Sequence, residues 1–203
     1  MVRLDLVVGP NGAGKTTFVE LVLAPLRPGV TFVNADVIAA ARWPDDPNGH
    51  AYDAAAVAAA TRQALIGARV PFIAETVFSH PSKLDLVSDA QAAGYVVALH
   101  VLLVPEHVSV QRVAHRVLAG GHDVPEEKIR GRYARLWPLV ADAITRADFA
   151  HIFDNSHIDG PDEVAMFAGG VPLGPCCWPD WAPASLTDRW PRRPTGEAVS
   201  PSP

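Results

Sequence analysis

The chain has 203 residues, of which 49% are apolar and 19% are charged, and its formal net charge is −5. This length supports one domain with a packed core, and the negative charge argues against general binding to nucleic acid or an anionic membrane. No apolar run approaches the roughly 18 residues that a membrane-spanning helix requires. The two cysteines, Cys176 and Cys177, are adjacent without a second pair to complete a zinc site, and no signal peptide is recognisable, so we expect a cytoplasmic protein.

Short apolar segments alternate with helical patterns over the first 160 residues. Strands are expected at residues 4–8, 31–34, 71–74, 95–104 and 149–154. Helices are expected at residues 15–26, 52–68, 82–93, 106–118 and 125–147. This alternation predicts an α/β fold with a doubly wound, five-stranded parallel sheet. A weak additional strand pair is expected around Gly169-Gly170.

The segment after the first strand matches the phosphate-binding motif G-x-x-x-x-G-K-[ST] between a predicted strand and a predicted helix. Its glycines allow backbone N–H groups to converge on phosphate oxygens, and the next helix adds the positive end of its dipole. We expect Lys15 to contact the β- and γ-phosphates and Thr16 to ligate Mg²⁺. The alternative, a chance glycine-rich turn, is disfavoured by the strand–loop–helix context. The expected nucleotide-binding residues are Gly9, Pro10, Asn11, Gly12, Ala13, Gly14, Lys15, Thr16 and Thr17.

Other signatures narrow the class of P-loop NTPase. The Leu-Ser-Gly-Gly-Gln string and the Asp-Glu strand end of transporter cassettes are absent from the sequence, as is the Asn-Lys-x-Asp of regulatory GTPases. The remaining class is that of small-molecule and nucleotide kinases, in which a lid closes over ATP and an acceptor.

Three polar residues follow the second and third predicted strands. Asp36 is expected to orient or deprotonate an acceptor hydroxyl, work worth about 10²–10⁴-fold in rate, and the alternative is that it caps a helix. Glu75 ends a strand beside the first one, where it can hold Mg²⁺ through water or bind acceptor hydroxyls. Thr76 is expected in the acceptor pocket, with a solvated strand end as an equal alternative.

Arginines gather on the last two predicted helices. Arg112 and Arg116 are four residues apart and share a helical face. Gly120-Gly121 supplies a hinge, and further arginines follow on the next helix. Because phosphoryl transfer concentrates negative charge on the γ-phosphate, such arginines can act catalytically, although many are simply solvated. The catalytic candidates are Lys15, Asp36, Arg116, Arg130 and Arg132.

These features predict three parts in the chain. Residues 1–160 form a P-loop kinase domain with a helical, arginine-bearing lid at about 112–135. Residues 161–189 form a C-terminal extension that packs on the domain. Residues 190–203 are rich in proline and polar side chains and are expected to form a disordered tail.

The motifs together resemble the zeta toxin family of P-loop kinases, in its compact branch. The resemblance covers about residues 1–160. It is carried by the phosphate loop, Asn-Ala-Asp at 34–36, Ala-Glu-Thr-Val-Phe-Ser at 74–79, the Gly-Gly-His-Asp-Val-Pro-Glu lid at 120–126, and Phe-Asp-Asn-Ser at 153–156. The resemblance implies an ATP- and Mg²⁺-dependent kinase acting on the 3′-hydroxyl of UDP-N-acetylglucosamine.

The resemblance also implies roles for single residues. Asp36 would be the base, Glu75 and Thr76 would lie in the acceptor pocket, and Asn155 would lie near the adenine. An antitoxin protein would be a partner. The alternatives are a kinase for another sugar, a nucleoside or an antibiotic and, from a different class, a nucleotide-gated binding module with slow ATPase activity.

Overall fold

The structure is a computed structural model that describes residues 1–118 and 124–192. The hinge expected at Gly120-Gly121 lies outside the described residues, as does the part of the expected tail from residue 193 onward. The described elements are the strands β1 (Val2–Val8), β2 (Thr31–Val33), β3 (Phe72–Thr76), β4 (Tyr95–Leu103), β5 (Phe149–Asp154), β6 (Asp162–Ala168) and β7 (Val171–Pro172), and the helices α1 (Lys15–Phe18), η1 (Val19–Leu23, π-helical), α2 (Ala24–Leu26), α3 (Ala35–Arg42), α4 (Ala51–Ala68), α5 (Ser82–Ala92), α6 (Glu106–Leu118), α7 (Glu126–Arg146) and α8 (Ala184–Thr187).

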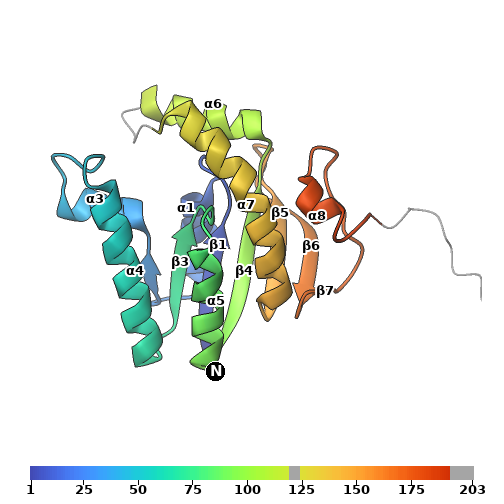
Figure 1. The fold of residues 1–203 in the computed structure, drawn as a ribbon, viewed down its shortest axis with the longest axis horizontal. Coiled ribbons are helices and arrows are strands. Elements are labelled where there is room, and N and C mark those ends of the chain that lie inside the picture. Colours follow the sequence, from blue (N-terminus) through green and yellow to red (C-terminus); the bar gives the residue numbers. More distant parts are fainter. Residues whose placement is uncertain (119–123, 193–203) are drawn as a thin grey trace, which may run out of the picture.

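The strands form one sheet in the order β2-β3-β1-β4-β5-β6-β7 (Figure 1). The first five strands pair in parallel, which confirms the predicted five-stranded parallel sheet. The expected weak strand pair is also confirmed, because β6 and β7 extend the sheet in antiparallel fashion. In β1 and β3, Val7 aligns with Glu75 and Val8 with Thr76, so the end of β3 lies beside the start of the phosphate loop.

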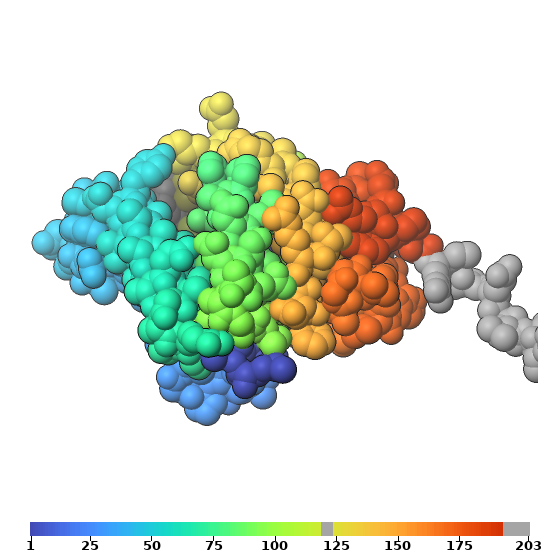
Figure 2. All heavy atoms as spheres, turned by 60° about the horizontal axis from the view of Figure 1, so that its bottom comes forward, coloured from blue at the N-terminus to red at the C-terminus, as the bar shows by residue number. Residues whose placement is uncertain are grey.

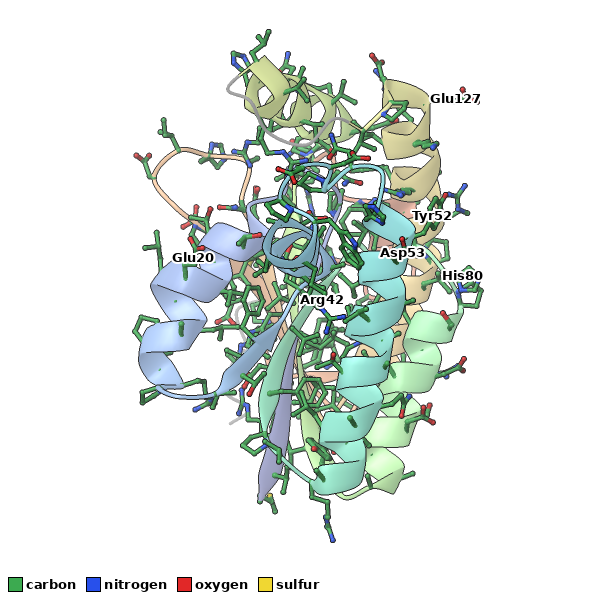
Figure 3. The ribbon with its side chains drawn as sticks, turned by 90° about the vertical axis from the view of Figure 1, so that its left-hand side faces the viewer. Glu20, Arg42, Tyr52, Asp53, His80 and Glu127 are labelled. Carbon is green, nitrogen blue, oxygen red and sulfur yellow. The ribbon has the colours of Figure 1, made fainter. Side chains whose placement is uncertain are left out.

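Helices cover both faces of this sheet. Figure 3 shows the continuous helical segment 15–26 on one side and α4 and α5 on the other. Figure 2 shows α4, α5 and α7 side by side over their face. Because side chains alternate along a strand, β1 serves two cores: Leu4, Leu6 and Val8 belong to the core under α4, α5 and α7, and Val7 belongs to the core with the helical segment 15–26. Because both faces of the sheet are buried, the parallel strands have continuous apolar sequences rather than alternating apolar and polar residues.

The segment after β7 returns to the sheet. Trp178 is 3% exposed, its ring lies near that of Phe167 in β6, and its indole N–H donates to the backbone oxygen of Trp190 over 2.7 Å. Trp190, which the composition placed in the disordered tail, is only 8% exposed and packs against Phe167. The prediction that the disordered tail starts at Trp190 is therefore wrong. Burial of the large apolar ring of Trp190 stabilises its packed position, although the residues around it are rich in proline. Cys176 is buried nearby and Cys177 is exposed.

No helix within the described residues combines the length and the apolar character needed to cross a bilayer.

Candidate functional site

The phosphate loop leaves β1 and enters α1 in a backbone conformation that requires glycine. Gly12 and Gly14 have φ angles of 70° and 80°. A Cβ atom at Gly12 would lie 2.9 Å from the backbone oxygen of Ser109 in α6, and one at Gly14 would lie 2.6 Å from the Asn155 amide nitrogen. The helix α6 and the residue after β5 therefore pack closely against the loop, and a side chain at Gly12 or Gly14 would have to displace them.

Lys15 projects from the first turn of α1 and is 7% exposed. Its Nζ donates to the backbone oxygen of Pro10 over 2.9 Å and lies 3.9 Å from Oε1 of Glu75. Burial lowers the pKa of Lys15, while the carboxylates of Glu75 and Asp36 oppose that shift. The ammonium group is thus held against the loop by one carbonyl and one carboxylate, and further negative charge beside it is favourable.

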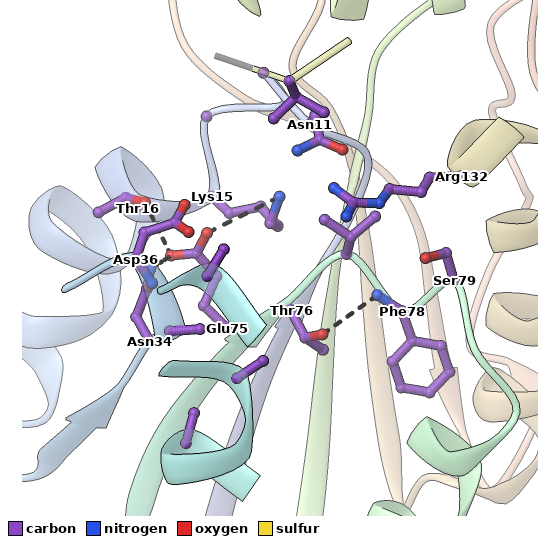
Figure 4. Close-up of a pocket in the computed structure, with 18 of the residues that line it drawn as sticks. Asn11, Lys15, Thr16, Asn34, Asp36, Glu75, Thr76, Phe78, Ser79 and Arg132 are labelled. Atoms are coloured by element: carbon purple, nitrogen blue, oxygen red, sulfur yellow. Dashed lines mark hydrogen bonds and ion pairs between the residues drawn. The ribbon is translucent and has the colours of Figure 1, made fainter. Parts of the chain in front are cut away.

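Glu75 connects three elements at the end of β3. Its Oε2 accepts from the Thr16 hydroxyl over 2.9 Å and from the Asn34 amide over 2.6 Å (Figure 4). Oxygen atoms of a hydroxyl and a carboxylate are the ligands that Mg²⁺ prefers, and such sites use only one or two protein oxygens beside phosphates and water. Within residues 1–118 and 124–192, no cluster of three or more His, Cys, Asp or Glu could hold a metal. Thr16 and Glu75 therefore fit a magnesium ion that is held largely by a nucleotide.

The helix α3, which the sequence analysis missed, places Asp36. Asn34 caps α3, because its side-chain oxygen accepts from the backbone nitrogens of Asp36 at 2.7 Å and Val37 at 3.3 Å. The alternative that Asp36 caps a helix is therefore wrong. The Asp36 carboxylate lines the pocket beside the phosphate loop, and Figure 4 shows it next to Thr16 and Glu75. An asparagine before a run of alanines was the signal that could have revealed this helix.

The arginines divide into two groups. Arg112, Arg116 and Arg132 line the same pocket as the phosphate loop. Arg130 does not; its guanidinium pairs with Glu106 at 3.1 Å and Glu126 at 2.8 Å on the exposed surface. The structure therefore brings Arg116 and Arg132, but not Arg130, to the candidate site.

Two further contacts fix the loop from the side of α6 and β5. The Ser109 hydroxyl, which the sequence analysis did not single out, donates to the Asn11 backbone oxygen over 2.6 Å. The Asn155 side-chain amide donates to the backbone oxygen of Ala13 over 2.8 Å, and the backbone oxygen of Asn155 accepts from the Arg112 guanidinium over 2.8 Å. Asn155 thus supports the loop, and the expected contact with adenine stays a prediction.

These elements enclose a pocket of about 520 Å³. It is lined by the phosphate loop, Asp36, Glu75, the arginines, α4, the segment 76–79 and the start of α5. In Figure 4, Lys15 and Thr16 lie across the pocket from Phe78 and Ser79. In the segment 76–79, Phe78 is fully buried and has a φ of 62°, a strained conformation for a large side chain that its packing must hold in place. The pocket has room for a phosphate donor at one end and an acceptor at the other.

The sheet order, the phosphate loop and the pocket define a P-loop, kinase-like, nucleotide-binding domain. More particularly, the chain belongs to the AAA domain family, whose sequence profile matches residues 4–139. No curated protein matches the sequence significantly.

Solved structures resemble the fold at low sequence identity. The structure of AvrRxo1-ORF1:AvrRxo1-ORF2 with sulphate ions has a TM-score of 0.67 at 16% identity, over 85% of this chain and 60% of that chain. The same complex with ATP has a TM-score of 0.66 at 16% identity, over 97% of this chain and 66% of that chain. The PezAT chromosomal toxin–antitoxin system of Streptococcus pneumoniae has a TM-score of 0.59 at 14% identity, over 82% and 71%. This chain thus spans less than two thirds of the AvrRxo1 chain, and the resemblance to zeta toxins is confirmed at the level of the fold.

Proposed function

We propose that the chain is an ATP- and Mg²⁺-dependent phosphotransferase that moves the γ-phosphate to a hydroxyl of a small-molecule acceptor. The observation that carries this proposal is the convergence of a phosphate loop, two carboxylates and the arginines of α6 and α7 on one pocket. A structural ion-pair network does not need a cavity of this size, whereas a reaction between two substrates does.

Each group has a chemical role in this proposal. The loop amides and Lys15 bind the β- and γ-phosphates, and Arg116 and Arg132 stabilise the negative charge that develops during transfer. Asp36 accepts the proton of the attacking hydroxyl. Magnesium, when bound through Thr16 and Glu75, would supply further charge neutralisation at the phosphates.

The acceptor follows from resemblance rather than from the pocket alone. Zeta toxins act on UDP-N-acetylglucosamine, which is therefore the first candidate, and other sugars, nucleosides and antibiotics are its rivals. Two of the structural neighbours are complexes with a second component, one of them called a toxin–antitoxin system, so an antitoxin is the proposed protein partner. We place the activity in the cytoplasm, where ATP is available.

The experiment is an ATP-consumption screen over nucleotide sugars, sugars, nucleosides and aminoglycosides, with mass detection of the product. We expect ATP to be consumed only when the correct acceptor is present, with a mass increase of one phosphate on that acceptor. Slow ATP hydrolysis that no acceptor accelerates, together with nucleotide-dependent affinity for a protein, would instead identify a nucleotide-gated binding module.

A further inference from the structure

A largely buried arginine on α4 lines the same pocket as the phosphate loop. The α4 residues that line the pocket are Ala51, Ala55, Ala58 and Arg62, which recur every three or four positions and share one face of the helix. The three alanines leave open space along this face. Arg62 follows them and is 7% exposed, so its long side chain lies within the pocket wall and not in solvent.

Arg62 has no counter-ion within the described residues. The ion pairs and hydrogen bonds of residues 1–118 and 124–192 include none from its side chain, and its neighbour Gln63 is the residue that bonds Asp89 of α5. Burial lowers the pKa of Arg62, with no nearby carboxylate to oppose it. The Arg62 nitrogens are absent from the fully buried polar atoms that lack a hydrogen bond, so the guanidinium reaches the open space of the pocket. A largely buried cation that faces a pocket and has no carboxylate partner is suited to bind an anion there.

A second cation joins Arg62 from the next helix. Lys83, in the first turn of α5, lines the same pocket and is half-buried. Burial and the positive charge of Arg62 both lower the pKa of Lys83, so the two cations repel each other. The pocket carboxylate of Glu75 is engaged by Thr16, Asn34 and Lys15, and it does not pair with either cation.

We propose that Arg62 and Lys83 form an anion-binding subsite for the acceptor, which therefore carries a phosphate or a carboxylate in addition to the hydroxyl that is phosphorylated. A guanidinium beside an ammonium group matches the oxygens of either anion, and the anion replaces the repulsion between the cations with charge-assisted hydrogen bonds. The subsite rests on the proposed kinase function for its place in the reaction.

The subsite also predicts selectivity among acceptors. A neutral alcohol in the same pocket leaves both cations without a counter-ion, and a site built around a polar group rejects ligands that lack it. The anion at Arg62 would direct the hydroxyl end of the acceptor toward Asp36. The buried residue Phe78 also lines this pocket.

The first test compares matched acceptors that differ only in their anion. The phosphate pair is N-acetylglucosamine with its 1-phosphate, and the carboxylate pairs are hydroxy acids with their amides. The two arms distinguish the two anions. We expect kcat/KM to favour the anionic member by about 10²-fold or more in one arm. Arg62→Met and Lys83→Met should each reduce that preference at least tenfold, mainly through KM. Exposed Lys128 provides the control, Lys128→Met, which should leave the preference unchanged.

The second test does not need turnover. With Mg²⁺ and a non-hydrolysable ATP analogue saturating the phosphate loop, inorganic phosphate should raise the melting temperature of the wild type more than that of Arg62→Met. Phosphate also stabilises proteins by exclusion from their surface, so the difference between variants is the measure, with Lys128→Met behaving as wild type. Without ligands, Arg62→Met should melt at a higher temperature than the wild type, because an unpaired buried charge is removed.

The two proposals fail in different ways. If no acceptor is phosphorylated but Arg62→Met loses the phosphate-dependent stabilisation, the anion subsite stands and the kinase function falls. If an acceptor is phosphorylated while Arg62→Met and Lys83→Met keep both the wild-type preference and the wild-type response to phosphate, the subsite is disproved and the kinase function stands.

Discussion

Two clusters of buried charge lie beside β1, and they differ in whether their residues line the candidate pocket. The Asp5 cluster consists of Asp5, Arg3, Arg27 and His100 and lies on the sheet face covered by the helical segment 15–26. Asp5 is 2% exposed and accepts from Arg3 at 2.8 Å, Arg27 at 3.2 Å and His100 at 2.9 Å. Although burial opposes it, the hydrogen bonds and charges of His100 and Arg3 hold the pKa of Asp5 well below its usual range.

The Lys15 cluster consists of Lys15, Thr16, Asn34 and Glu75 at the carboxyl end of the same sheet. Its charges are also paired, yet all four residues line the pocket, whereas no residue of the Asp5 cluster does. A perturbed pKa therefore does not by itself separate a structural cluster from a functional one. The cavity makes the distinction, and exchanging a residue in each cluster should separate loss of activity from loss of stability.

Lys15→Ala should have the largest effect on activity. We expect turnover to fall on the order of 10³–10⁵-fold, the range seen when a cation is removed from a transferring phosphoryl group. The fold should be retained, because the Lys15 side chain makes only two polar contacts within the described part of the chain, with the Pro10 carbonyl and Glu75, and its removal takes a buried charge out of the loop. The measurement is acceptor-dependent ATP consumption beside a thermal melt; a large fall in the melting temperature would place Lys15 with the structural cluster.

Asp36→Asn should lower turnover by about 10²–10⁴-fold while ATP affinity is kept. The carboxylate lies at the pocket, but the cap of α3 belongs to Asn34, so the helix does not depend on it. Single-turnover kinetics and calorimetry with ATP separate the two effects. Equal losses of ATP affinity and rate would instead assign Asp36 to the metal.

Arg132→Ala should lower turnover by about 10²–10³-fold, as expected when one of several charge-stabilising donors is removed. Arg130→Ala is the matched variant on the same helix, and we expect it to change turnover less than threefold because Arg130 pairs with surface glutamates. Equal effects of the two substitutions would show that the helix moves during the reaction and brings Arg130 to the phosphates.

The contrast between Arg130 and Arg132 also shows what could be predicted from the sequence. Residues two apart on a helix are about 200° apart around its axis, so Arg130 and Arg132 could not both face one pocket. The sequence therefore predicts that the two arginines point in different directions. It does not predict which face of α7 meets the pocket, since that depends on packing against α6 and the sheet. The parallel, doubly wound sheet was predictable because the alternation of strands and helices is a local pattern and the crossovers have one hand.

The presence of Arg62 and Lys83 in one pocket could not be predicted from local sequence patterns. In the sequence Arg62 belongs to an alanine-rich helix and Lys83 to the start of another, and nothing in either segment indicates that they meet. Likewise, Asp5 and His100 are 95 residues apart and come together only because β1 pairs with β4. Side-chain clusters formed across a sheet follow from register, which a single sequence does not specify in detail.

Asp5→Asn should have the opposite result to Lys15→Ala. The asparagine keeps the shape of the side chain but lacks the negative charge that accepts hydrogen bonds from Arg3, Arg27 and His100. We therefore expect the free energy of unfolding to fall by about 2 kcal/mol. Turnover per folded molecule should stay within twofold of the wild type, because the cluster does not touch the pocket. Urea unfolding and active-site titration provide the measurements; a turnover loss without a stability loss would overturn the division between the clusters.

The smallest effect is a pH dependence of stability that originates in His100. Burial lowers the pKa of His100, although its hydrogen bond to Asp5 and the charge of Asp5 oppose the shift. As the pH falls below about 6.5, the unfolded chain binds a proton that folded His100 resists, so the stability must decrease on acidification. One such proton contributes at most about 1.4 kcal/mol per pH unit. The measurement is the urea midpoint at neutral and at mildly acidic pH. His100→Gln should reduce the loss of stability between these two pH values, because glutamine keeps an N–H donor and does not titrate. His107 is exposed, and His107→Gln should retain the wild-type slope; equal slopes in all three proteins would show that His100 takes up its proton as readily when folded as when unfolded.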